Sequence, residues 1–240
     1  MTTLPHTRPC FLLVVAAVGC SVAIGCWSGR TNTEPPQPMD RHERTIRDTT
    51  LALQHDPHDV AAYFNRAAAY RKKRDYDKAV ADYSKVIELT PDDSDAFLTR
   101  GAVYSDKGDY DSAIRDFAEA IRLTPEALLA SSADAYCARG KAYAAKGDHQ
   151  NAIDDLTKAV TLTPNDATAF HARGVAYLEQ GEHDKAIADF SRAIKAGAQY
   201  PDPEAFYHRG LAYEESGEPA KAEADFAKAK SLGFKQEPKE

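Results

Sequence analysis

The chain has 240 residues, of which 43% are hydrophobic and 28% are charged, an ordinary balance for a globular protein. Its formal net charge of -7 argues against a nucleic-acid-binding protein, which would show a basic face or stripe. After residue 57, Val and Ile mostly stand singly, without the alternation that is typical of β-strands. The composition therefore predicts a largely helical protein.

The N-terminus carries an apolar segment. From Cys10 to Trp27 there are 18 residues without a charge, and only Arg8 is charged before them. This pattern predicts that residues 1–26 are an export signal peptide or a short membrane anchor, which we exclude from the fold. A single span needs about 20 apolar residues, so this segment is marginally long enough for one.

The same segment resembles a bacterial lipoprotein signal, in which a small residue precedes a cysteine that becomes lipidated. Two places match, AVGC ending at Cys20 and AIGC ending at Cys26. Cys26 is favoured because the chain after it is polar, whereas Ser21 favours Cys20. An uncleaved anchor and ordinary cleaved secretion remain the alternatives. The resemblance implies an exported, membrane-associated protein on the envelope or periplasmic side of a bacterial membrane.

A linker and a short helix are predicted next. Residues 27–39 contain Pro35, Pro36 and Pro38, which favour extended geometry, so this linker could span roughly 35–40 Å. Residues 40–57 fit the second half of the repeating unit described below. We expect them to form a half-repeat helix that caps the first complete unit.

The remainder of the chain repeats one pattern five times. An arginine recurs at intervals of 34, 39, 34 and 36 residues, with an aromatic residue three positions before it and a tyrosine four positions after it. One copy reads Phe170-x2-Arg173-Gly174-x2-Tyr177, followed by Ala186-x3-Phe190. This pattern resembles the tetratricopeptide repeat (TPR) family, with Arg in place of the usual Leu.

The resemblance implies an all-α fold, a right-handed superhelical solenoid of helix-turn-helix repeats. Within residues 58–240 it places five repeats and a short tail, with the repeats at about 60–91, 94–125, 133–164, 167–200 and 203–233. Glycine followed by an acidic residue separates the helices of the last four repeats. We expect each glycine to end a helix in the left-handed conformation, and an aspartate after it can cap the next helix. The first repeat has Arg74-Asp75 there, which predicts a strained turn.

Each repeat also has an aspartate sixteen residues after its arginine. The two residues fall on successive helices of one unit, so we predict a ladder of structural Arg–Asp pairs across the seam between them. The alternative is an arginine row that binds an anionic ligand. The predicted pairs are Arg66 with Asp82, Arg100 with Asp116, Arg139 with Asp155, Arg173 with Asp189, and Arg209 with Asp225.

In the TPR family the first helix of each unit lines a concave groove, and the resemblance implies that a partner would contact the variable positions there. The groove is expected to be basic at its start and acidic at its end, a polarity that could orient an extended peptide or helix. The candidate partner-binding residues are Phe64, Asn65, Arg71, Lys72, Leu98, Lys141, His171, Leu178, Tyr207, His208, Glu214 and Glu215.

No motif for catalysis is present: the sequence lacks HExxH, a P-loop, GxSxG and a dinucleotide fingerprint. We therefore expect no catalytic residue, metal or cofactor. The predicted function is a non-catalytic scaffold, tethered to a membrane by an N-terminal anchor or lipid, that binds a segment of another protein and no nucleic acid. The alternative is a structural homo-oligomer that associates through an uncapped last repeat. Phe226 and Phe234 would leave an apolar end there, unless the tail folds back over it.

Overall fold

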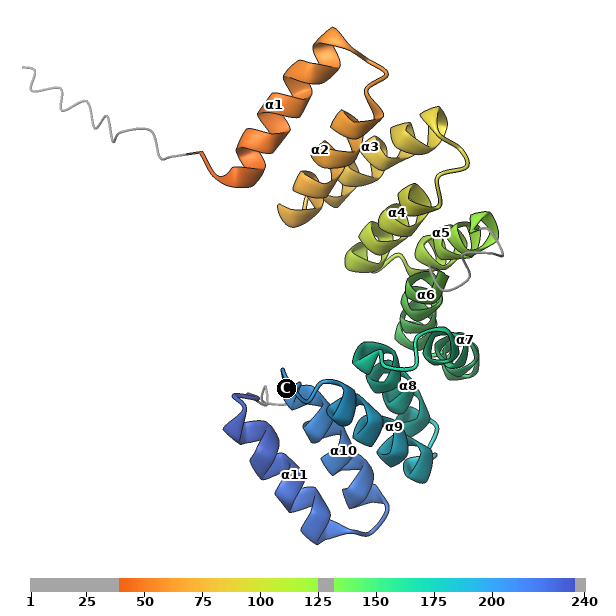
Figure 1. The fold of residues 1–240 in the computed structure, drawn as a ribbon, viewed down its shortest axis with the longest axis vertical. Helices are drawn as coiled ribbons and strands as arrows, with labels where there is room; N and C mark the ends of the chain where they lie inside the picture. The colour runs from red at the N-terminus through yellow and green to blue at the C-terminus, as the bar shows by residue number, and fades with distance from the viewer. Residues whose placement is uncertain (1–38, 125–131, 236–240) are drawn as a thin grey trace, which may run out of the picture. The chain divides into compact units, whose positions relative to one another are not determined.

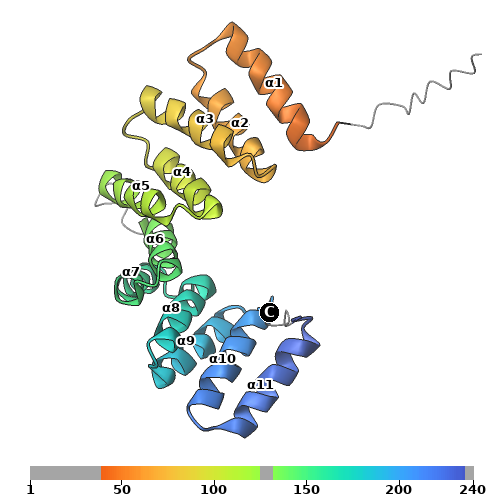
Figure 2. The same ribbon diagram turned by 180° about the vertical axis from the view of Figure 1, so that it is seen from behind.

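The computed structural model describes residues 39–124 and 132–235, and these form eleven α-helices and no β-strand (Figures 1 and 2). The predicted signal or anchor, with Cys20 and Cys26, and nearly all of the linker lie outside the described residues. The helices are α1 (Arg41–His55), α2 (Val60–Lys72), α3 (Tyr76–Leu89), α4 (Ser94–Lys107), α5 (Tyr110–Leu123), α6 (Ala133–Ala145), α7 (His149–Leu162), α8 (Ala167–Glu179), α9 (His183–Ala196), α10 (Pro203–Glu215) and α11 (Pro219–Ser231).

Helices α2 to α11 form five hairpins, and each hairpin is one unit of the repeat. Every helix packs against the helix before it and the helix after it, so neighbouring units share a continuous core. In addition, α4 contacts α6, α6 contacts α8, and α8 contacts α10, which makes the first helices of the units one row. Helix α1 packs on α2 ahead of the first unit. The all-α solenoid of helix-turn-helix repeats is thus confirmed.

Acidic residues begin the first helix of most units. The side chains of Asp59, Asp93, Asp166 and Asp202 each accept a backbone N–H of the following first turn, as Asp40 does for α1. The second helices are less uniform. Asp109 and Asp148 cap α5 and α7 in the same way, whereas Asp75, Glu182 and Glu218 make no side-chain cap bond. The two aspartates that follow a glycine at this turn, Asp109 and Asp148, therefore cap the next helix as predicted, whereas the two glutamates do not.

The turn inside each unit needs a left-handed residue. Gly108, Gly147, Gly181 and Gly217 have φ values between 75° and 85°, and Arg74 takes φ 62° in the first unit. An L-residue with a Cβ pays roughly 1 kcal/mol or more for this conformation, because its Cβ crowds the backbone. Arg74 therefore stores strain that the other four turns avoid.

One large side chain fills the seam of each inner unit. These residues are Tyr83, Phe117, Leu156 and Phe190, and each is at most 2% exposed. The facing first helix is small at the point of contact: a Cβ added at Gly174 would lie 2.8 Å from the ring of Phe190. Close approach of the two helices and a large side chain in the seam thus depend on each other. The corresponding side chain of the last unit, Phe226, is only half-buried.

No helix in the described ranges 39–124 and 132–235 has the length and apolar character that crossing a membrane requires.

Candidate functional site

The repeated arginines turn into the seam between the two helices of their own unit. Arg173 Nε donates to Asp189 Oδ2 at 2.6 Å, and its Nη2 donates to Asp189 Oδ1 at 3.0 Å. The other four predicted pairs have the same two-pronged geometry, with distances between 2.6 and 2.9 Å. The five aspartates are buried, so water screens these pairs only weakly.

Each pair also holds its guanidinium in the charged form. Hydrogen bonding to Asp82 raises the pKa of Arg66 above its ordinary value, and Asp116, Asp155 and Asp225 do the same for their arginines. The pKa of Arg173 is also raised, by Asp189 against the opposing effect of burial. Because Nε and Nη2 of each arginine are engaged by the aspartate of its own unit, these side chains are directed into the seam.

A third hydrogen bond, which the sequence analysis missed, ties most of these pairs to the preceding unit. Arg173 Nη1 donates to Thr157 Oγ1 on α7 at 3.0 Å. Arg66, Arg100 and Arg209 donate in the same way to a hydroxyl of the preceding helix, at distances of 3.0 to 3.2 Å, the acceptors being Thr50, Ser84 and Ser191. Ser84, Thr157 and Ser191 each stand two residues after the aspartate of their own unit. This regular spacing is the sequence signal from which the third hydrogen bond could have been predicted.

The link is missing between the second and third units. The residue two positions after Asp116 is Ala118, which has no hydroxyl. Arg139 accordingly keeps its two bonds to Asp155 and has no hydroxyl acceptor on α5. This joint therefore lacks one of the hydrogen bonds that the other joints share.

Several predicted groove residues are half-buried and pack within the array. The ring of Phe64 meets Tyr83 edge to face at 5.2 Å between centroids, and Tyr207 stacks on Phe234 at 4.4 Å. Leu98 and Leu178 lie against the core clusters around Phe117 and Phe190, respectively. These four side chains thus contribute to packing as well as to the inner surface.

Part of the positive charge at the predicted basic start of the groove is paired with an acidic residue of the next unit. Arg71 Nε donates to Asp106 Oδ2 on α4 at 2.6 Å, which joins the first and second units. Among the other candidates, Asn65, Lys72, Lys141, Glu214 and Glu215 are exposed. At the predicted acidic end of the groove, Glu215 also contacts the neighbouring unit, since its Oε2 lies 3.3 Å from His183 Nδ1 on α9. Some of the charge on this surface is therefore paired between units, and the polarity from one end to the other stays a prediction.

Two predicted groove histidines contact each other between the fourth and fifth units. His171 Nε2 on α8 lies 3.0 Å from His208 Nδ1 on α10, and Phe190 packs against both rings. Burial lowers the pKa of His171 to about 4, and burial also lowers the pKa of His208. Both imidazoles are therefore neutral at pH 7, as one donor and one acceptor require.

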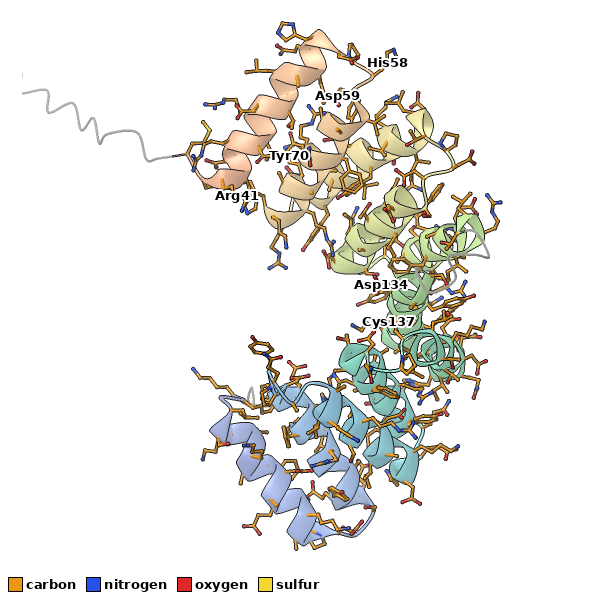
Figure 3. All side chains as sticks on the ribbon, viewed as in Figure 1. Arg41, His58, Asp59, Tyr70, Asp134 and Cys137 are labelled. Carbon is orange, nitrogen blue, oxygen red and sulfur yellow. The ribbon has the colours of Figure 1, made fainter. Side chains whose placement is uncertain are left out.

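A hollow of about 440 Å³ lies beside α6 and the start of α8. Its lining includes Asp134, Cys137, Lys141 and Asp166. Figure 3 shows Asp134 and Cys137 together on α6, the middle one of the first helices. Burial raises the pKa of the Cys137 thiol to about 11, so this sulfur is a packed thiol rather than a nucleophile at neutral pH. The hollow offers polar contacts but no reactive group.

The comparisons with known proteins agree with this architecture. A comparison with curated proteins gives no match. Family models described as tetratricopeptide or TPR repeat match residues 60–93, 83–115, 101–147, 140–181 and 171–234.

Solved structures are similar over most of the chain. A crystal structure of MamA is 32% identical, with 69% of this chain and 93% of MamA covered and a TM-score of 0.61. YrrB, titled "a TPR protein with an unusual peptide-binding site", is 25% identical over 78% of this chain and 93% of its own, with a TM-score of 0.60. MamA from Desulfovibrio magneticus RS-1, at 19% identity, 72% and 94% coverage and a TM-score of 0.64, shares the fold. The chain belongs to the tetratricopeptide repeat family.

Proposed function

We propose that this protein is a non-catalytic scaffold, exported and tethered to a membrane, that holds a segment of another protein against the row formed by its first helices. The observation that supports this most directly is the continuity of that row. Because α4, α6, α8 and α10 touch in succession, their exposed side chains form one surface across four units. A long, shallow surface of this kind suits an extended peptide or a helix better than a small molecule.

The chemistry of the surface supports binding without catalysis. Lys141 and Glu179 are exposed on this row, and the hollow beside α6 could seat one side chain of a partner. Within the described residues, no group of three or more His, Cys, Asp or Glu side chains could hold a metal ion. Proteins of this family are generally interaction scaffolds, and YrrB is described as a TPR protein with an unusual peptide-binding site. Binding of a protein partner is thus the function that these features support best.

The tether rests on the sequence. The 18 uncharged residues from Cys10 to Trp27, with small residues before Cys20 and Cys26, favour a lipidated or membrane-anchored N-terminus. Mass spectrometry of the mature N-terminus tests this proposal. A diacylglyceryl mass on Cys26 or Cys20 supports lipidation, an intact leader supports an anchor, and a cleaved N-terminus without lipid contradicts the tether.

The partner surface can be tested by cross-linking in cells that express the full chain. Charge reversals on the inner row, Lys141→Glu with Glu179→Lys, should reduce the yield of a specific cross-linked partner at least tenfold, since such contacts set partner choice. The matched control is Lys195→Glu with Glu88→Lys, which leaves the net charge unchanged and lies on exposed positions of second helices. Equal loss in both variants, or loss in neither, contradicts the proposal.

A second candidate, self-association through the last unit, has one feature in its favour. A hollow of about 650 Å³ remains at this end, lined by Tyr207, Leu211, Phe226 and Phe234 among others. Against it, charged Glu223 and Lys230 flank Phe226 on α11, and Phe234 from the tail already stacks on Tyr207. Sedimentation over a hundredfold range of concentration distinguishes the candidates, because only the oligomer gains mass as concentration rises.

A further inference from the structure

The first turn of α1 and the end of α2 lie side by side. Lys73 Nζ, just after α2, is 2.5 Å from Glu43 Oε1 and 3.4 Å from Asp40 Oδ2 at the start of α1. These contacts bring two stretches that are about thirty residues apart to one end of the helix pair. Figure 3 shows Arg41 at this end of α1, where the described part of the chain begins.

Four further basic residues adjoin Asp40, Glu43 and Lys73 in the chain. They are Arg41, Arg44, Lys72 and Arg74, and we call them the basic end. All four are exposed, and they make no ion pair with any described residue. Asp40 and Glu43 are already engaged by Lys73, and Asp75, which follows Arg74, is engaged by Lys78. The positive charge of the basic end is therefore not compensated within the described fold.

This charge runs against the balance of the whole chain. Residues 39–89, which hold α1 and the complete first unit, contain ten Lys and Arg and nine Asp and Glu, a net charge of +1, whereas the complete chain has -7. The last unit with its flanking residues, 200–235, contains five Lys and Arg and seven Asp and Glu, a net charge of -2. The N-terminal end of the array is thus set apart electrostatically.

Arg74 provides an independent reason to assign this charge a role. The other four units place glycine at its position, which relieves the left-handed turn. The first unit keeps an arginine at φ 62° instead, and the exposed side chain forms no ion pair that would offset the strain. A residue held in a sparsely populated backbone region, with an exposed side chain that makes no ion pair, motivates the hypothesis of an external contact.

The position of the basic end identifies the class of that contact. Only the predicted linker, residues 27–39, separates it from the 18 uncharged residues that the proposed function assigns to a membrane. A linker of this length spans roughly 40 Å at most. The basic end is therefore the part of the array attached directly to the tether, and lipid headgroups supply the phosphates that Lys and Arg bind.

Resting on the membrane tether of the proposed function, we propose that the basic end binds anionic headgroups of the same bilayer and so fixes the orientation of the array on it. The tether alone would leave the array free to rotate, whereas a second contact at α1 and the end of α2 restricts it. Each basic residue near an anionic surface contributes about fivefold in affinity, and salt weakens that contribution.

The test uses the full chain and two kinds of vesicle, phosphatidylcholine alone and phosphatidylcholine with phosphatidylglycerol. The test variant is Arg41→Gln, Arg44→Gln and Arg74→Gly, in which the last change also relieves the turn. The control variant is Arg115→Gln, Lys195→Gln and Lys228→Gln, which removes the same charge from exposed positions on second helices. Circular dichroism verifies that all three proteins are folded.

The preference for anionic over neutral vesicles is the quantity measured. We expect the test variant to lower this preference by about a hundredfold in low salt, and the control variant to leave it within twofold. The inference is overturned if the wild type shows no preference for anionic vesicles, or if both variants lose it equally. It is also overturned if the preference persists in the test variant.

Binding to neutral vesicles reports on the tether separately. If the chain does not bind neutral vesicles, the proposed tether is wrong. Its preference for anionic over neutral vesicles would still show whether the basic end binds anionic headgroups. If the wild type binds a polyanion such as heparin in solution more tightly than anionic vesicles, a soluble polyanion replaces lipid as the ligand and the proposal fails.

Discussion

The second helices of the inner units and that of the last unit differ at two positions. In the inner units, the alanine of the helix seam is followed by Val or Ile, and a second such residue stands seven positions later; the pairs are Val80 and Ile87, Ile114 and Ile121, Ile153 and Val160, and Ile187 and Ile194. The first member of each pair lies in a core cluster, and those clusters extend onto the next first helix. In α11 the same positions hold Glu223 and Lys230.

The difference shows how this array ends. The seam within the last unit keeps its alanine, aspartate and phenylalanine, so the helix pair still forms. The surface that would receive another unit has lost its two branched apolar side chains to charged ones. A terminal unit with a polar outer face is what a soluble array requires. We expect substitutions in the helix seam of the last unit to lower stability less than the same substitutions in an inner unit.

The largest expected effect comes from the seam aromatics. Phe190→Ala should cost about 3–5 kcal/mol in the free energy of unfolding, because the ring is fully buried between two units. Phe226→Ala should cost about half as much, since that ring is only half-buried. Urea unfolding of the two variants measures both, and equal costs would contradict the contrast between inner and last units.

The Arg–Asp pairs come next. Asp189→Ala leaves Arg173, which is 8% exposed, as a buried charge without its partner, and this should cost about 3 kcal/mol. The same change at Asp225 should cost less, because the side chain of Arg209 is 19% exposed and that of Arg173 only 10%. The double variant Arg173→Leu with Asp189→Leu serves as a control, and it should regain much of the loss if desolvated charge is the cause.

The histidine pair makes the joint between the fourth and fifth units sensitive to acid. Because the pKa of His171 is lowered in the fold to about 4, the unfolded chain binds more protons between that pH and about 6.5. Stability from this group is therefore fully present above pH 6.5 and is lost as the pH falls toward 4, by up to about 3 kcal/mol.

Hydrogen exchange of α8 to α10 should accordingly accelerate more than that of α2 to α4 between pH 7 and pH 4.5, after correction for intrinsic rates. His171→Gln should flatten this dependence. Asp202, Glu204, Glu179 and Lys141 also act on the pair, and all four are unchanged in that variant. A pH response that is unaltered by His171→Gln would show that the carboxylates, rather than the imidazoles, control this joint.

The smallest effect concerns the missing hydroxyl. Ala118→Ser places an acceptor where the other joints have one, and it should stabilise the joint by about 0.5–1.5 kcal/mol by accepting from Arg139. Ser84→Ala should destabilise the preceding joint by a similar amount, since it removes the acceptor of Arg100. Thermal unfolding of the two variants should move in opposite directions, and a shift in the same direction contradicts the role of the hydroxyl.

Features within one unit could be predicted from the sequence, and features between units mostly could not. The partners Arg173 and Asp189 are related by the fixed spacing of one hairpin, as are Gly174 and Phe190. The contacts of Arg71 with Asp106 and of His171 with His208 depend instead on the rotation between neighbouring hairpins. That rotation arises from the packing of many side chains, so no single spacing in the sequence reveals it. The hydroxyl acceptors are an exception among the contacts between units, because Ser84, Thr157 and Ser191 each stand two residues after the aspartate of their unit.

The absence of a hydroxyl at Ala118 has a consequence for how the array comes apart. Stability in a stacked array is transmitted only through nearest neighbours. Four arginines each fasten three helices at once, whereas Arg139 fastens only the two of its own hairpin. The arginine bonds therefore link α1 to α5 and, separately, α6 to α11. Under mechanical load or in denaturant, we expect α5 and α6 to separate before the other neighbouring helices do.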